Sequence, residues 1–250
     1  MPFDVEMVRA AFPGRRIEWF ASAPSTMTIA AQLAREGCAP GTVAGADEQS
    51  AGMGRHGHSW HSNAEAGLYV SIVLRLPVGS NALPVVMLAL GLAAQEAIAE
   101  VSGLAADLRW PNDVMIGGKK CAGILAQLDG PAIVAGIGIN VNHEEFPDGI
   151  APLATSLRLA GASVAREDLL IELLRAIDDA CEMMIERGTP AILEAFARAS
   201  SYAAGRRVRF ERDGAMIEGV TRGLDASGFL LVREDNGKET TIFAGGVRPA

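Results

Sequence analysis

The stretch "ADLRWPNDVMIGGKKCAGILAQLDGPAIVAGIGINVN", residues 106–142, places several apolar segments in succession with no helix between them. Pro111 and Asn112 separate two short apolar runs, and glycine-containing turns bound two longer ones. Runs of this length, bounded by turn residues, are typical of buried strands. Because strands and helices do not alternate strictly here, the sequence favours a mixed sheet backed by helices over a doubly wound sheet.

The helices are expected outside this stretch. Residues 25–37 show helical spacing of Ala and Leu between a Ser-Thr start and a terminal glycine. Residues 83–101 are apolar on nearly all sides, which predicts a central buried helix. Residues 166–188 have an amphipathic pattern, and a shorter helix follows over 189–200. Further strands are expected over 41–47 and 66–76.

The pattern changes after about residue 204, where apolar and polar residues alternate. Asp213-Gly214, Ala226-Ser227-Gly228 and Asn236-Gly237 recur at hairpin intervals. We therefore expect an α+β protein with two units. Residues 1–203 would form the larger domain, which contains the mixed sheet. Residues 204–250 would form a small five-stranded β-barrel.

Composition narrows the function classes. The chain has 250 residues and a net charge of −8, which argues against a nucleic-acid partner, because such proteins need a basic face. No uninterrupted apolar run reaches about 18 residues, so we expect no membrane span. The N-terminus does not look like a secretory signal. Cys38, Cys121 and Cys181 are far apart and form no CxxC pair, which favours buried thiols in a cytoplasmic protein over disulfides or a zinc site.

The loop "GADEQSAGMGRHGHSWHS", residues 45–62, is too polar and too rich in glycine for a core element. Its glycines allow backbone N–H groups to approach a phosphate closely, and Arg55 can bind a phosphate or carboxylate with two nitrogens. An ordinary mobile surface loop is an equally good interpretation of this segment alone. Its three histidines have no fixed spacing and no carboxylate nearby in sequence, so a metal site is not expected.

Three more segments carry candidate site residues. "WPND" presents Asn112 and Asp113 beyond a strand end, although Pro-Asn-Asp is also good turn chemistry. Lys120 precedes an apolar run, so its ammonium could point into a pocket, although paired lysines on a turn are usually solvated. In "GIGIN", Gly136 and Gly138 weaken a strand unless another group must pass close by. Asn140, at its end, could hydrogen-bond a purine edge.

Taken together, these segments resemble the biotin protein ligases. That family has, in order, a Ser-Thr pair, a Gln before a Gly- and Arg-rich loop ending in Trp, then Leu-Tyr-x-Ser, Trp-Pro-Asn-Asp, Lys-x-x-Gly-Ile-Leu and Gly-Ile-Asn. Here they stand as Ser25-Thr26, Gln49, "GMGRHGHSW", "LYVS", "WPND", "KCAGIL" and "GIGINVN". The match extends from about residue 16 to the end. It implies a catalytic fold of the class II synthetase type, followed by an SH3-like barrel.

The resemblance also implies a reaction. Biotin reacts with MgATP to give biotinoyl-AMP, and a lysine of a carboxylase carrier domain then takes the biotin. The implied catalytic residues are Arg55, Lys120 and Asp113, with Asp113 receiving or orienting the acceptor lysine. The implied biotin contacts are Ser25, Thr26, Met27, Gln49, Gly52, Met53, Gly54, Arg55 and Lys120. The implied ATP and adenylate contacts are Arg55, Trp60, Asn112, Lys120 and Asn140, with Asn140 reading adenine.

Some positions depart from the family pattern. His56 and His58 stand where the family has arginines, Met53 replaces another, and Met27 follows the Ser-Thr pair in place of Asn. Because the pair arrives at Ser25, we expect a form without the N-terminal DNA-binding domain of some members. Two alternatives stay open: a lipoate or other acyl-group ligase on the same fold, and a non-catalytic biotin- or carrier-binding protein. A homodimer is possible by analogy.

Overall fold

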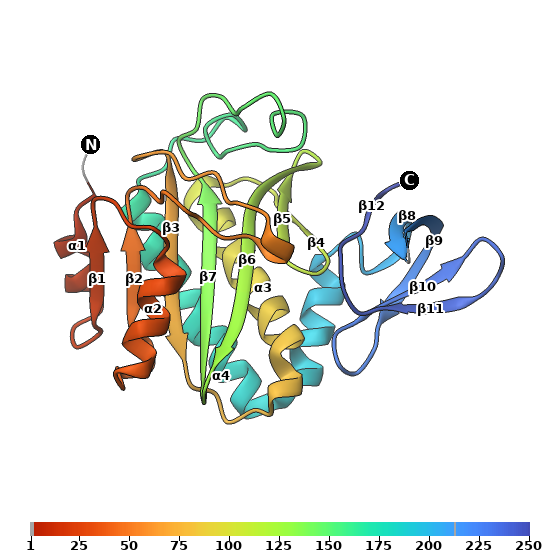
Figure 1. The fold of residues 1–250 in the computed structure, drawn as a ribbon, viewed down its shortest axis with the longest axis horizontal. Coiled ribbons are helices and arrows are strands. Elements are labelled where there is room, and N and C mark those ends of the chain that lie inside the picture. The colour runs from red at the N-terminus through yellow and green to blue at the C-terminus, as the bar shows by residue number, and fades with distance from the viewer. Residues whose placement is uncertain (1–2, 213) are drawn as a thin grey trace.

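The computed structural model describes residues 3–212 and 214–250, which form two β-sheets with helices packed on the larger one (Figure 1). The larger sheet has seven strands in the order β1-β2-β3-β7-β6-β5-β4. They are β1 (Ile17–Phe20), β2 (Val43–Ala46), β3 (Gly67–Leu74), β4 (Asp107–Arg109), β5 (Asp113–Ile116), β6 (Lys119–Asp129) and β7 (Ala132–Asn140). β1 and β2 are parallel and the other neighbouring pairs are antiparallel, which confirms the expected mixed sheet.

Helices cover both faces of this sheet (Figure 1). α2 (Thr26–Arg35) lies on one face, and α3 (Leu83–Ser102) and α4 (Arg166–Ala199) lie on the other. Gly188 has a left-handed φ of 73° and divides α4 into the two helices expected from sequence. The sequence interpretation missed α1 (Val5–Ala11) and β1, which are short. It also missed the 3-10 turns η1 (Arg55–Gly57) and η2 (Ser80–Ala82).

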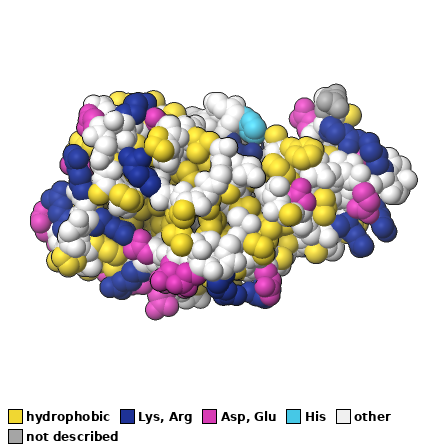
Figure 2. All heavy atoms as spheres, turned by 90° about the horizontal axis from the view of Figure 1, so that it is seen from below, with side chains coloured by type: hydrophobic (Ala, Val, Ile, Leu, Met, Phe, Trp, Pro, Cys, Tyr) yellow, Lys and Arg dark blue, Asp and Glu magenta, His cyan; other side chains and the backbone are white. Residues whose placement is uncertain are grey.

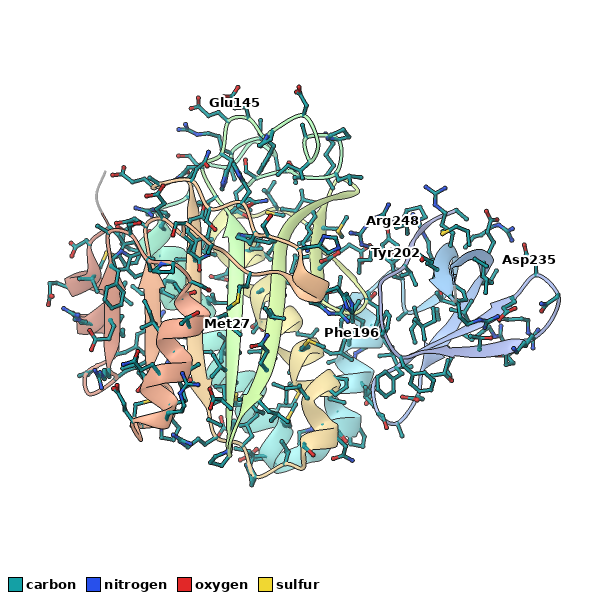
Figure 3. All side chains as sticks on the ribbon, in the orientation of Figure 1. Met27, Glu145, Phe196, Tyr202, Asp235 and Arg248 are labelled. Carbon is teal, nitrogen blue, oxygen red and sulfur yellow. The ribbon has the colours of Figure 1, made fainter. Side chains whose placement is uncertain are left out.

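Alternation along β3 gives the two faces of the sheet different tasks. Leu68, Val70 and Ile72 belong to the large core beneath α3 and α4. Tyr69 and Ser71 alternate with them, so they point to the face that α2 covers. Met27 of α2 lies against this face, where its side chain points toward β7 (Figure 3). The candidate site is on the α2 face.

α3 is a core helix with unusual composition. The segment Ser80–Ser102 is long and apolar enough to cross a membrane by length and composition alone, which the run-length argument from sequence did not anticipate. However, 56% of its apolar window is buried inside the protein, against α4 and the sheet. This packing is typical of the central buried helix that the sequence predicts. Seen from below, apolar side chains are frequent across the molecule, with charges of both signs mainly toward the edges (Figure 2).

The C-terminal strands form the second sheet, in the order β11-β10-β9-β8-β12, with every pair antiparallel. They are β8 (Ala204–Arg212), β9 (Ala215–Leu224), β10 (Leu230–Glu234), β11 (Glu239–Ile242) and β12 (Arg248–Pro249). Five strands in this arrangement fit the expected SH3-like module. Asp213, in the first expected turn, lies outside the described residues. Trp110 Nε1 donates to Gly228 O at 2.9 Å, so this module contacts the "WPND" segment.

Candidate active site

Glycines open a trough on the α2 face of the large sheet. Tyr69 of β3, Gly138 of β7 and Gly123 of β6 are directly opposed in register, and they form one row across three strands. In the next row, Gly136 lies between Ser71 and Leu125. Directly opposed residues share a face, so the missing side chains leave a depression at the centre of the sheet.

Trp60, from the loop of residues 45–62, packs in this trough. A Cβ added at Gly138 would lie 2.5 Å from Trp60 Cε2, and one at Gly123 would lie 2.9 Å from Trp60 Cζ3. Both distances are too short for a real Cβ, so the indole requires glycine at the two positions. Lys120 Nζ lies 5.3 Å from the centroid of the same ring. The glycines noted in "GIGIN" are therefore explained by close approach.

One end of the trough is polar. Gln49 Oε1 accepts hydrogen bonds from Thr26 N at 2.9 Å and Thr26 Oγ1 at 3.2 Å, and its Nε2 donates to Ser62 Oγ at 3.0 Å. Thr26 Oγ1 also hydrogen-bonds Ser71 Oγ at 2.8 Å. Ser25 Oγ is buried and has no hydrogen-bond partner in residues 3–212 or 214–250. Because buried polar groups are normally hydrogen-bonded, Ser25 would be satisfied by a polar ligand group.

The opposite end carries ionised groups. Asp113 Oδ1 lies 2.5 Å from Lys120 Nζ, and Asp113 Oδ2 lies 2.7 Å from Arg109 Nη2. Burial acts to raise the pKa of Asp113, but Lys120 and Arg109 outweigh it, and the pKa lies below its usual value. Asp113 is therefore ionised at neutral pH. Two cations around one carboxylate leave this end with a net positive charge.

Arg55 contributes a third cation from η1. Its Nη1 donates to Asn112 Oδ1 at 3.2 Å and to Gly245 O, in the C-terminal module, at 3.0 Å. Burial lowers the pKa of Arg55 from its usual value, and nearby Asp113 opposes that shift. Arginine stays protonated throughout the working pH range. Within the described part of the chain these contacts occupy one guanidinium nitrogen, and the others remain available to an anion.

Most sequence-predicted residues meet in one pocket. Those lining it are Ser25, Thr26, Met27, Gln49, Met53, Gly54, Arg55, Trp60, Asn112 and Lys120. Three predicted residues do not line it. Gly52 O accepts a hydrogen bond from the backbone N–H of Trp60. Asp113 forms an ion pair with Lys120, and the side-chain amide of Asn140 donates to Thr155 O. His56 and His58 are exposed.

Several lining residues were not among those predicted. They are Tyr69, Val70, Gly123, Ile124, Leu125, Gly136, Ile137 and Gly138. Glycine inside a strand was the available signal for Gly136 and Gly138, and "LYVS" was the signal for Tyr69. The arrangement suits a small molecule with a polar head at Gln49 and an anionic group at Lys120 and Arg55. No group of three or more His, Cys, Asp or Glu side chains in the described ranges could hold a metal ion.

Known proteins are similar to this chain. Residues 19–143 match the biotin/lipoate A/B protein ligase family, and residues 204–247 match the biotin protein ligase C-terminal domain. The biotin–[acetyl-CoA-carboxylase] ligase of Mycobacterium tuberculosis is 33% identical over 248 residues, which cover 96% of this chain and 91% of the relative. The bifunctional ligase/repressor BirA of Bacillus subtilis is 32% identical over 224 residues, 85% of this chain and 68% of the relative.

A solved structure is similar as well. Biotin protein ligase from Aquifex aeolicus, in complex with biotin and ATP, matches with a TM-score of 0.82 and 30% identity. The alignment covers 94% of this chain and 99% of the Aquifex chain. The likeness therefore extends through both sheets.

Proposed function

The chain belongs to the biotin/lipoate A/B protein ligase family, and we propose that it makes biotinoyl-AMP and transfers biotin to a lysine of a carboxylase biotin-carrier domain. In the first step a biotin carboxylate oxygen attacks the α-phosphorus of ATP, and pyrophosphate leaves. In the second step the neutral lysine amine attacks the acyl carbon. An amide forms, AMP leaves with the bonding electrons, and the amine loses a proton.

The observation that carries this proposal is the two-ended trough. Gln49, Thr26 and Ser25 form a polar end, and Lys120 and Arg55 supply positive charge at the other. A polar head site suits the ureido ring of biotin better than the apolar dithiolane of lipoate, which is the alternative substrate on this fold. Binding the ureido ring alone would need neither cation, so their presence favours a ligase over a binding protein.

The cations stabilise the charge that moves during adenylation. Biotin carboxylate and ATP are both anions, so fixed positive groups in a site of low water content are the main catalytic contribution. We assign Lys120 to the carboxylate and α-phosphate and Arg55 to the adenylate. ATP enters as its Mg²⁺ complex, so the metal comes with the substrate. Asp113 as recipient of the acceptor lysine and Asn140 as the adenine reader stay predictions.

The two sheets divide the work in this proposal. Residues 1–203 form the catalytic unit, and residues 204–250 form a module that supports it. The supporting contacts are Arg55 Nη1 to Gly245 O and Trp110 Nε1 to Gly228 O. Both link the module to segments that line or flank the pocket.

Biotin-dependent exchange between ATP and pyrophosphate tests the first step. The purified protein should exchange labelled pyrophosphate into ATP only when biotin is present, and lipoate should not replace biotin. Exchange with lipoate alone would favour the alternative ligase. Absence of exchange with either acid, while biotin still raises the thermal unfolding midpoint, would favour a non-catalytic binding protein.

Gly138→Ala should disable the site while the protein still folds. The new Cβ would lie 2.5 Å from Trp60 Cε2, so the indole must leave its seat over the sheet. Overpacking of this kind typically costs about 1–3 kcal/mol of stability. We expect biotin-dependent exchange to fall at least about 10-fold, since misplaced site groups cost about that much or more.

Gly149→Ala is the matched control for Gly138→Ala. Apart from Gly149 itself and its two chain neighbours, no atom of the described residues lies within 4 Å of the position its Cβ would take, so exchange and thermal unfolding should stay as in the wild type. An exchange rate in Gly138→Ala equal to that of the wild type would show that the reaction does not require the Trp60 indole to pack over Gly138.

A further inference from the structure

Arg109 stands at the end of the cross-strand row that crosses the trough. Arg109 of β4 is directly opposed to Asp113 of β5, and Asp113 is directly opposed to Gly123 of β6. The row continues through Gly138 to Tyr69. Opposed residues share a face, so Arg109 lies on the ligand face of the sheet although it does not line the pocket.

Arg109 and Lys120 contact different oxygens of the Asp113 carboxylate. Arg109 donates to Oδ2 from Nε at 3.2 Å and from Nη2 at 2.7 Å, whereas Lys120 Nζ lies 2.5 Å from Oδ1. All three side chains are largely shielded, with exposures of 19% for Arg109, 14% for Asp113 and 29% for Lys120. At such sites a paired carboxylate would cancel most of the charge of a single lysine. The second cation prevents that cancellation.

We propose that Arg109 is a positioning residue for adenylation: it fixes Asp113 through Oδ2, so that Oδ1 holds the Lys120 ammonium over Gly123 while Lys120 keeps its positive charge. The inference rests on the proposed function of Lys120. The side chain of Lys120 runs across Gly123, where an added Cβ would lie 3.0 Å from both Cε and Nζ. An ammonium on a flexible stem needs such an anchor to stay in one place.

A purely structural role for Arg109 is the competing explanation, because the ion pair also spans the turn at residues 110–112. Both explanations predict a less stable protein when Arg109 is replaced. They differ in pH dependence. The charged groups that face Asp113 are Arg109 of β4, Lys120 of β6 and Arg55 of η1. Removing Arg109 removes one cation, so the pKa of Asp113 must rise.

The sign of the effect on activity follows from that rise. When Asp113 takes up a proton, Lys120 loses its anchor and the adenylation rate falls. In Arg109→Gln the loss should therefore occur at a higher pH than in the wild type. Removing one opposite charge at hydrogen-bond distance shifts a carboxyl pKa by about one unit or more. Ionisation of biotin and ATP contributes the same pH dependence to the profiles of the wild type and the variant. The difference between the two profiles therefore reports on ionisation of the enzyme.

The test compares kcat and KM of biotin-dependent pyrophosphate exchange from the acidic range in which a carboxyl group titrates up to mildly basic pH. In Arg109→Gln we expect kcat at neutral pH to fall about 10-fold, as for other supporting partners of a functional group. We also expect the acidic limb to move up by about one pH unit. Arg109→Lys should return the limb toward the wild type. Arg233→Gln removes another directly opposed ion pair, Arg233–Glu239, outside the site and should change neither quantity.

Wild-type kcat and pH profile in Arg109→Gln, whatever its unfolding temperature, would overturn the proposal. If that variant does not fold, Arg109→Met, which keeps the apolar stem, replaces it. The same measurements decide: a lower kcat and a shifted acidic limb support the proposal, and a wild-type kcat and pH profile overturn it. The result is separable from the proposed function. No exchange in the wild type counts against the function, whereas equal exchange in wild type and variant counts only against Arg109.

Discussion

Lys120→Ala should reduce adenylate formation about 100- to 1000-fold, the usual loss when one fixed group that stabilises transition-state charge is removed. Lys120 lines the pocket, with its Nζ held by Asp113 and placed over the Trp60 ring. Two anions must meet in the first step, and no other lysine lines this pocket in the described ranges. Single-turnover formation of biotinoyl-AMP measures the effect directly.

Lys119→Ala is the matched control for Lys120→Ala. Lys119 is the adjacent lysine on the same strand, but it is exposed, and its Nζ is 3.4 Å from Ala151 O. Its removal should leave adenylation unchanged. The unfolding midpoint of both variants must be measured, because Lys120→Ala leaves Asp113 with Arg109 as its one remaining ion-pair partner among the described residues. Near-normal adenylation in a folded Lys120→Ala protein would remove Lys120 from the mechanism.

Arg55→Gly should release biotinoyl-AMP on the order of 100-fold faster, because truncating one partner of a shielded, charged hydrogen-bonded pair acts mainly on dissociation. Arg55 donates to Asn112 and Gly245, and under the proposed function its remaining nitrogens bind the adenylate. Released adenylate reacts with any exposed lysine. We therefore expect the variant to label bystander proteins, read by mass spectrometry of a carrier domain mixed with an unrelated protein.

His56→Gly separates loss of the guanidinium from added loop flexibility. His56 is in the same 3-10 turn, is exposed, and has a φ of 54° that glycine adopts readily. This variant should keep the selectivity of the wild type for the carrier. If Arg55→Gly also labels only the carrier, Arg55 does not retain the intermediate.

Sequence patterns predicted the elements whose signals are local. β3, β6, β7 and α3 are runs of apolar residues bounded by turn residues, and α2 and α4 have helical spacing. β1 was missed because it is a four-residue edge strand, whose position depends on parallel pairing with β2 and on stacking of Trp19 with Phe3. Neither contact leaves a local signature.

The site residues divide in the same way, into those with a local sequence signal and those that depend on tertiary contacts. Ser25, Thr26, Gln49, Arg55 and Lys120 could be identified because they stand in motifs. The role of Gly123 could not, because it depends on the register that brings the glycine beneath Trp60. Arg109 was read only as part of a strand. Its meeting with Asp113 requires the β4–β5 hairpin, although the spacing of four residues was visible in the sequence.

Transfer of biotin to a carrier lysine tests the central claim most directly. The wild-type protein, biotin, MgATP and a purified biotin-carrier domain are incubated together, and the intact mass of the carrier is measured. A carrier with its acceptor lysine replaced by arginine, and a reaction with lipoate in place of biotin, serve as controls. We predict that the carrier gains the mass of one biotinoyl group, only with biotin and ATP and only at the acceptor lysine. An unchanged carrier mass, with protein that is folded and binds biotin, would contradict the account.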